Sequence, residues 1–152
     1  MKKYILILIM FATTMLGAMA QESFAKQFKG KDGYSCVTIG KAALKMMPAQ
    51  SRKNLKVGRV ADKIDRLEIV SANNEESSAR LSEACNYWIE KDGFESLIDV
   101  DDNGEQASIM MKSNGKNNIY LLLANEKRNT SVIIIYGTLT LEEIREMTGG
   151  GE

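Results

Sequence analysis

The longest regular pattern of the chain runs from Phe94 to Tyr136, where short apolar stretches alternate with turn residues. The dipeptides Asn103-Gly104 and Asn114-Gly115 each offer the positive-φ residues that a tight type I′ hairpin needs. We therefore expect these strands to form an antiparallel meander. The pattern predicts four strands, at Phe94–Val100, Glu105–Lys112, Asn118–Ala124 and Ser131–Tyr136.

Apolar positions within these strands predict two faces of different character. One face is expected to build the core, through Ala107, Ile109, Met111, Ile119, Leu121, Leu123, Val132, Ile134 and Tyr136. The last two strands are apolar on their other face as well, through Tyr120, Leu122, Ile133 and Ile135. Either a helix of the same chain covers that second face, or it binds an envelope protein or a second copy of the chain.

The first half of the chain alternates helical and strand patterns. The closing segment from Thr140 is also helical, and Trp88, Met46 and Met47 are expected in the core. Together the elements predict a single α+β domain, with helices packed on a mainly antiparallel sheet. The patterns predict helices at 21–29, 41–47 and 51–64, strands at 34–39 and 66–71, and a long helix capped by Asn73 that ends at Gly93.

The first twenty residues have the form of a secretory signal peptide. Lys2 and Lys3 precede an apolar run, and small residues follow it up to Ala20. An uncleaved membrane anchor is the alternative, but the apolar run is short for a bilayer span. We expect cleavage before Gln21, export to the periplasm or medium, one domain over 21–148 and a disordered tail over 149–152.

The composition argues against most enzyme classes. The chain has no histidine, which removes the usual general base of hydrolases and a common zinc ligand. No Ser-x-x-Lys, Gly-x-Ser-x-Gly, Walker or dinucleotide-binding motif occurs. Carboxylate catalysis stays open, since many acidic residues are present, but their spacing selects no pair. The sequence therefore predicts a non-catalytic protein without a cofactor.

Two smaller features have simple structural interpretations. Asp99 to Gly104 matches the first half of a calcium loop, but Met110 stands where the bidentate glutamate belongs. An acidic hairpin turn is the simpler interpretation, and we predict no metal site. Cys36 and Cys85 are the only cysteines; strand alternation points Cys36 away from Val37 and Ile39, which favours two separate thiols over a disulfide.

Charge is unevenly distributed along the chain. Residues 41–66 are mainly basic and residues 75–105 mainly acidic. The predicted helix over 51–64 carries one basic face, formed by Arg52, Lys56, Arg59 and Lys63. This face is either a solvated helix surface or a binding site for an anionic lipid or glycan. Nucleic acid is not expected as a partner, because an exported protein does not meet it and no aromatic residues interleave the basic block.

Three segments resemble the family called domain of unknown function 4252. They are Gly33 to Pro48, the segment Ile-Asp-Arg-Leu-Glu-Ile-Val at 64–70, and the closing segment Ile-Ile-Ile-Tyr-Gly-Thr-Leu-Thr-Leu-Glu-Glu-Ile at 133–144. The resemblance implies a small exported bacterial protein with one α+β domain and no recognised cofactor. It implies no catalytic residues, because its motifs are patterns of apolar and turn residues.

Overall fold

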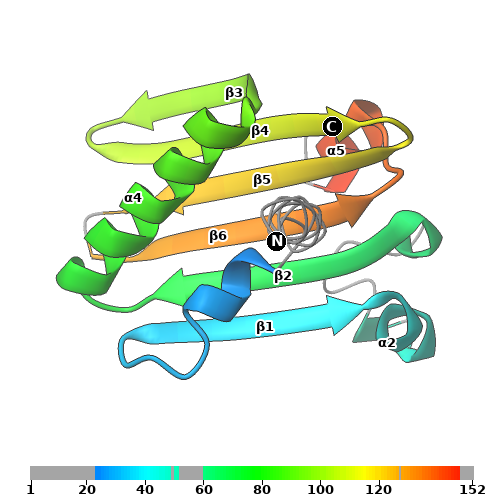
Figure 1. The fold of residues 1–152 in the computed structure, drawn as a ribbon, viewed down its shortest axis with the longest axis horizontal. Coiled ribbons are helices and arrows are strands. Elements are labelled where there is room, and N and C mark those ends of the chain that lie inside the picture. The colour runs from blue at the N-terminus through cyan, green and yellow to red at the C-terminus, as the bar shows by residue number, and fades with distance from the viewer. Residues whose placement is uncertain (1–22, 49, 52–59, 127, 148–152) are drawn as a thin grey trace, which may run out of the picture.

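A computed structural model describes residues 23–48, 50–51, 60–126 and 128–147 (Figure 1). Its centre is a six-stranded sheet in which every neighbouring pair is antiparallel, in the order β1-β2-β6-β5-β4-β3. The predicted meander is confirmed, because β3 to β6 follow one another along the chain and across the sheet. The strands are β1 (Tyr34–Gly40), β2 (Ile64–Ala72), β3 (Glu95–Asp102), β4 (Glu105–Asn114), β5 (Asn117–Asn125) and β6 (Thr130–Gly137).

The described helices lie on both faces of this sheet. Helix α4 (Glu75–Asp92) crosses the near face diagonally, and the short helix η1 (Phe24–Gln27) lies beside it (Figure 1). The elements α2 (Lys41–Met46), η2 (Ala61–Lys63) and α5 (Leu141–Met147) contribute to a second core on the opposite face. The predicted α+β domain with helices packed on an antiparallel sheet is therefore confirmed.

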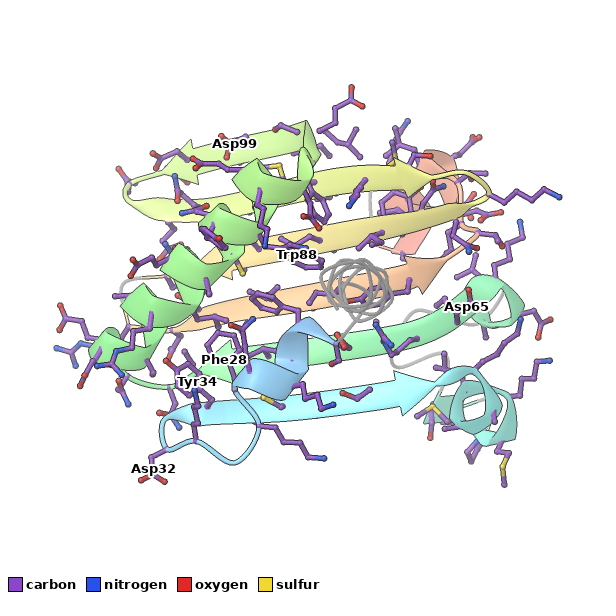
Figure 2. All side chains as sticks on the ribbon, in the orientation of Figure 1. Phe28, Asp32, Tyr34, Asp65, Trp88 and Asp99 are labelled. Carbon is purple, nitrogen blue, oxygen red and sulfur yellow. The ribbon has the colours of Figure 1, made fainter. Side chains whose placement is uncertain are left out.

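The face that α4 covers, called here the α4 face, holds the larger core. Aromatic rings link η1 to α4 and β1: Trp88 stacks on Phe24 at a centroid distance of 5.1 Å, and Phe28 meets Tyr34 at 4.8 Å (Figure 2). The sheet contributes Val70, Leu121, Leu123, Val132 and Ile134 to the same cluster. Burial of this apolar surface fixes α4 and η1 on the sheet.

The opposite side of the sheet, called here the back face, holds a separate core. Leu44 from α2, Leu139 and Ile144 pack there on Leu67, Tyr120 and Ile135 of the strands. All six of these side chains are nearly or fully inaccessible to solvent. A sheet that is apolar on both sides therefore forms the middle of a three-layer domain.

The pairing of β4 with β5 shows why one predicted core face is wrong, because a two-residue turn places odd-numbered residues of one strand opposite even-numbered residues of the next. Asn103 and Gly104 both have positive φ, as a type I′ turn requires, but the next turn consists of Gly115 and Lys116. That turn pairs Met110 with Leu121 and places Ile109 opposite Leu122. Ala107, Ile109 and Met111 therefore lie on the back face, whereas Ile119, Leu121 and Leu123 lie on the α4 face.

Two further predictions need correction. The cap of α4 is Asn74 rather than Asn73: its side chain accepts from Ser77 N at 2.8 Å, and Asn74 N donates to Ser77 Oγ. Met46 is 84% exposed instead of buried, because Leu44 is the residue of α2 that faces the core. Met47 and Trp88 are partly buried against the two cores, as expected for core residues.

Candidate functional site

Half of the back face is covered by the chain itself. The covered half is centred on a row of residues that are neighbours across the strands: Ile39, Leu67, Ile135, Tyr120 and Met111. The hydroxyl of Tyr120 donates to the carbonyl of Leu139 at 2.8 Å, which ties the segment after β6 to this row. Burial raises the pKa of Tyr120, so the neutral hydroxyl is retained as a donor.

The next row on the back face is apolar from one edge of the sheet to the other. It contains one residue from each strand, and each is the registered partner of the next. The row, called here the apolar row, is Val37, Ile69, Ile133, Leu122, Ile109 and Ile98. With strands about 4.8 Å apart, it spans roughly 24 Å between its outer members.

No member of the apolar row is fully buried. The two outer residues are the most exposed, Val37 at 44% and Ile98 at 42%, and the four inner residues are partly buried. Tyr120 and Ile135, one row away, are fully or nearly fully buried. Ile39 and Met111 of that neighbouring row are partly buried, like the inner members of the apolar row, and Leu122 and Ile133 also pack against the back-face core. Among the described residues, burial on the back face therefore decreases gradually from Tyr120 and Ile135 toward the apolar row.

Beyond the apolar row, the side chains become small. The next row runs across the six strands as Ser35, Ser71, Ser131, Ala124, Ala107 and Val100. The hydroxyl oxygens of Ser71 and Ser131 lie 3.4 Å apart. The branched aliphatic side chains of the apolar row thus lie beside a row of mostly smaller side chains. From strand and residue spacings, the two rows together cover roughly 350 Å² of the sheet.

The chemistry of this surface is limited to contact. Neither row contains an ionisable side chain, so no serine hydroxyl there has a general base within the rows. An apolar patch of a few hundred square ångströms is the size of the largest such patch on a typical monomer, and that patch is often functional. The open half of the back face is therefore the candidate functional site.

The structure divides the four predicted partner-binding residues. Tyr120, Leu122, Ile133 and Ile135 do lie on one face, as neighbouring pairs of β5 and β6. Tyr120 and Ile135 belong to the covered core, and only Leu122 and Ile133 belong to the apolar row. The sequence did not reveal the other members of the row, because their alignment depends on pairings between strands distant in sequence, such as β2 with β6.

The predicted basic face lies mostly outside the described residues. This applies to Arg52, Lys56 and Arg59, and only Lys63 is described. Lys63 is the last residue of η2, and its ammonium forms an ion pair with the Glu143 carboxylate of α5. That hydrogen bond from Lys63 holds the pKa of the Glu143 carboxyl below its usual range.

A second concave surface lies on the outer side of α4. The groove measures about 710 Å³, and its lining includes Glu75, Glu83, Glu90, Glu126 and Tyr87. Its ionisable lining groups are carboxyls and one phenol, without a cationic partner among the lining residues. No cluster of three or more potential metal ligands occurs among the described residues. The groove therefore brings several carboxyl groups to one concave surface, which is what carboxylate catalysis would require.

The two cysteines face the same layer, which corrects the reasoning from strand alternation. Cys85 is buried in the core of the α4 face, and Cys36 packs at its margin, with its thiol donating to the Ala25 carbonyl at 3.6 Å. Both are free thiols. Strand alternation correctly placed Cys36 and Val37 on opposite faces of the sheet. Cys36 still packs against a core, because both faces of the sheet carry one.

Comparisons with known proteins add a family and no activity. A family model described as a domain of unknown function (DUF4252) matches residues 28–147, which is most of the chain. No curated protein matches the chain. Among the helices that the structure describes, none combines the length and apolar character needed to cross a membrane.

Proposed function

The chain belongs to this DUF4252 family, and we propose that it is a non-catalytic, exported module that binds another envelope protein through the apolar row. The observation that carries the proposal is the unbroken run of six aliphatic residues across the sheet, left partly exposed beside a covered core. Exposure supports this use of the row most clearly at its outer members, Val37 and Ile98, which are both more than two-fifths exposed.

The composition supports contact rather than catalysis. The chain lacks histidine, and the two open rows contain no ionisable side chain. An apolar partner surface gains about 25 cal/mol for each square ångström removed from water. A stable interface buries about 800 Å² per partner, so the contact is expected to extend beyond the two open rows. Such a contact resists salt, because screening acts on charges and not on apolar burial.

The leader-like first twenty residues support export, and they define where the partner is sought. Lys2, Lys3 and the small residues before Gln21 have the order of a cleavable signal peptide. The partner is therefore expected among proteins of the cell envelope.

The test is affinity capture from solubilised envelopes with the protein expressed with its own leader. Wild-type protein should retain one partner in stoichiometric amount through a high-salt wash. Ile133→Asp and Leu122→Asp should each lose it, because a carboxylate in the middle of the row must be desolvated on binding. Tyr87→Asp is the matched control, since Tyr87 is 66% exposed on α4 and outside the row.

Circular dichroism must show that each variant is folded before its result is used. Ile133→Ser, a smaller change at the same position, replaces Ile133→Asp if the latter unfolds the protein. Retention of the partner by a folded Ile133 variant contradicts the proposal. Absence of any salt-resistant partner with wild-type protein also contradicts it.

A further inference from the structure

The two edge strands of the sheet differ sharply in charge. β1 and β3 each have one neighbour, so one side of each backbone has no strand to pair with. β1 contains no charged residue, whereas β3 carries Glu95, Asp99, Asp101 and Asp102. Charged residues on an edge usually prevent pairing with other strands, so β3 resists another acidic strand and β1 has no such protection.

The segments that flank β1 are basic. Lys29 and Lys31 precede the strand, and Lys41 and Lys45 follow it. Lys41 also forms an ion pair with Asp65 at 3.6 Å, with both side chains about half exposed. The β1 edge is therefore an uncharged strand whose flanks carry four lysines and Asp32, so these flanks are net basic and opposite in sign to the β3 edge.

The apolar row ends at these same two edges. Val37 of β1 and Ile98 of β3 are its most exposed members, because each lacks a neighbour on its outer side. A strand added at either edge would supply that neighbour. The best complement to Val37 is an aliphatic residue in a strand with acidic flanks, which describes Ile98 in β3.

We propose that β1 pairs with β3 of a second copy of the chain, which extends the sheet from one molecule into the next. The strand directions allow it. Five successive antiparallel pairings make β1 and β3 run in opposite directions, so a second copy displaced across the strands meets β1 with an antiparallel β3. Because the second copy is shifted sideways and not turned over, the back faces of the two copies lie on the same side of the extended sheet.

One register joins the surfaces of the two copies. With Val37 opposite Ile98 of the second copy, Ser35 lies opposite Val100, so both open rows continue across the junction. The same register places Asp101 of the copy opposite Tyr34, next to the turn that carries Lys31 and Asp32. Lys29 and Lys31 outnumber Asp32 there, so this end of the junction brings mainly opposite charges together.

The alternative pairings between copies bring like charges together. β1 with β1 of a second copy, antiparallel about a two-fold axis, places the Lys31 end beside the Lys41 end. β3 with β3 places aspartates on aspartates. Like charges directly opposite one another destabilise strand pairs, so charge selects the β1–β3 junction.

The junction leaves a free edge at each end of the pair. Such a head-to-tail contact does not close on itself, so the assembly is expected to lengthen as concentration rises. The contact is small and partly electrostatic. High salt should therefore shorten the assembly, in contrast to the salt-resistant partner contact proposed for the middle of the row.

Sedimentation velocity of the purified protein over a range of concentrations tests the junction. The average mass of the wild type should rise with concentration and fall in high salt. Val37→Asp and Ile98→Asp should each remain monomeric over the same range, which corresponds to an association weakened about tenfold or more. Tyr87→Asp, on the outer surface of α4, should behave as the wild type.

Mixing the two variants separates this junction from the alternatives. The Val37→Asp chain keeps an intact β3, and the Ile98→Asp chain keeps an intact β1, so an equimolar mixture should give a dimer of one copy of each and nothing larger. A dimer formed by Ile98→Asp alone would indicate β1–β1 pairing and overturn the proposal. A wild type that stays monomeric throughout would also overturn it.

The outcome is independent of the proposed function. Ile133→Asp changes the middle of the row and leaves both edges intact, so it should lose envelope capture and keep self-association. Both edge positions are more than two-fifths exposed, so the edge variants are expected to fold. Val37→Ser and Ile98→Ser replace them in the mixing experiment if circular dichroism shows otherwise.

Discussion

The Nε atom of Arg66 lies 3.5 Å from Oε1 of Glu68, and the Glu68 side chain is fully buried on the α4 face. The guanidinium carbon of Arg66 lies 4.1 Å above the ring of Tyr136, and the Tyr136 hydroxyl donates to Glu68 Oε2 at 3.3 Å. Burial and the nearby Glu68 carboxylate raise the pKa of Tyr136, so its hydroxyl stays a donor. The carboxylate thus depends on these two neighbours for compensation.

Replacing Glu68 with alanine should lower the free energy of unfolding by about 2–3 kcal/mol, because Arg66 loses its ion-pair partner and the Tyr136 hydroxyl loses its acceptor. Urea denaturation measures the change. Glu76→Ala is the control, since Glu76 pairs with Arg80 at 2.8 Å but is 77% exposed and should contribute less than about 1 kcal/mol. Equal losses in the two variants would contradict the assigned role of burial.

The Cys85 thiol should make stability depend on pH above 9. Burial raises its pKa from 9.0 to about 12. Below pH 9 the thiol is protonated in both the folded and unfolded states, and its contribution is fully present. Above pH 9 only the unfolded state ionises, so stability is lost as pH rises toward the folded pKa, by up to about 1.4 kcal/mol for each pH unit.

Comparing the pH slope of the unfolding free energy between pH 9 and 10 in the wild type and in Cys85→Ala isolates this effect, because the tyrosines, which titrate near pH 10, contribute to both slopes. Cys85→Ala should reduce the slope with pH, even if the small cavity lowers stability at every pH. Cys36→Ala should reduce it less, because Cys36 is only partly buried and its pKa is raised to a smaller degree. An unchanged slope in Cys85→Ala would exclude the thiol as the cause.

Asn74 and Asn73 provide a pair of adjacent amides with different expected effects. Asn74→Ala should destabilise the protein by about 1 kcal/mol, because Ser77 N loses its acceptor at the start of α4. Asn73→Ala should change stability by less than about 0.5 kcal/mol, since Asn73 is exposed and is not the helix cap. Thermal unfolding of the two variants side by side distinguishes these effects, and a larger loss for Asn73→Ala would reverse the assignment.

The residue types at turns and helix ends predicted where strands and helices lie better than they predicted how the strands pair. Asn103-Gly104 gave its hairpin because both residues adopt positive φ, and Gly93 ended α4 in the left-handed conformation. Asn114-Gly115 failed by one residue, since glycine alone supplied the positive φ of that turn. That shift moves the strand pairing by two residues and leaves the faces unchanged. The inverted face came from assigning Ile109 and Leu121 to one side, which no two-residue turn allows.

Only part of the candidate site was predicted, because its residues come together through strand pairing. Leu122 and Ile133 were visible as a second apolar face of two adjacent strands. The alignment of Val37 with Ile69, and of Ile69 with Ile133, depends on contacts between strands far apart in sequence. Periodicity within one strand contains no information about such registers, so the row could not be recognised before the sheet was known.

The turn at Gly115 and Lys116 has a consequence for how the surface changes over time. Removing or adding one residue there would shift β4 by one position against β5, and Met110 would exchange sides with Ile109. The row would then be interrupted at β4 without any substitution within the strand. Under the proposed function, a chain with a different loop length at this turn would therefore present an interrupted row on the same scaffold.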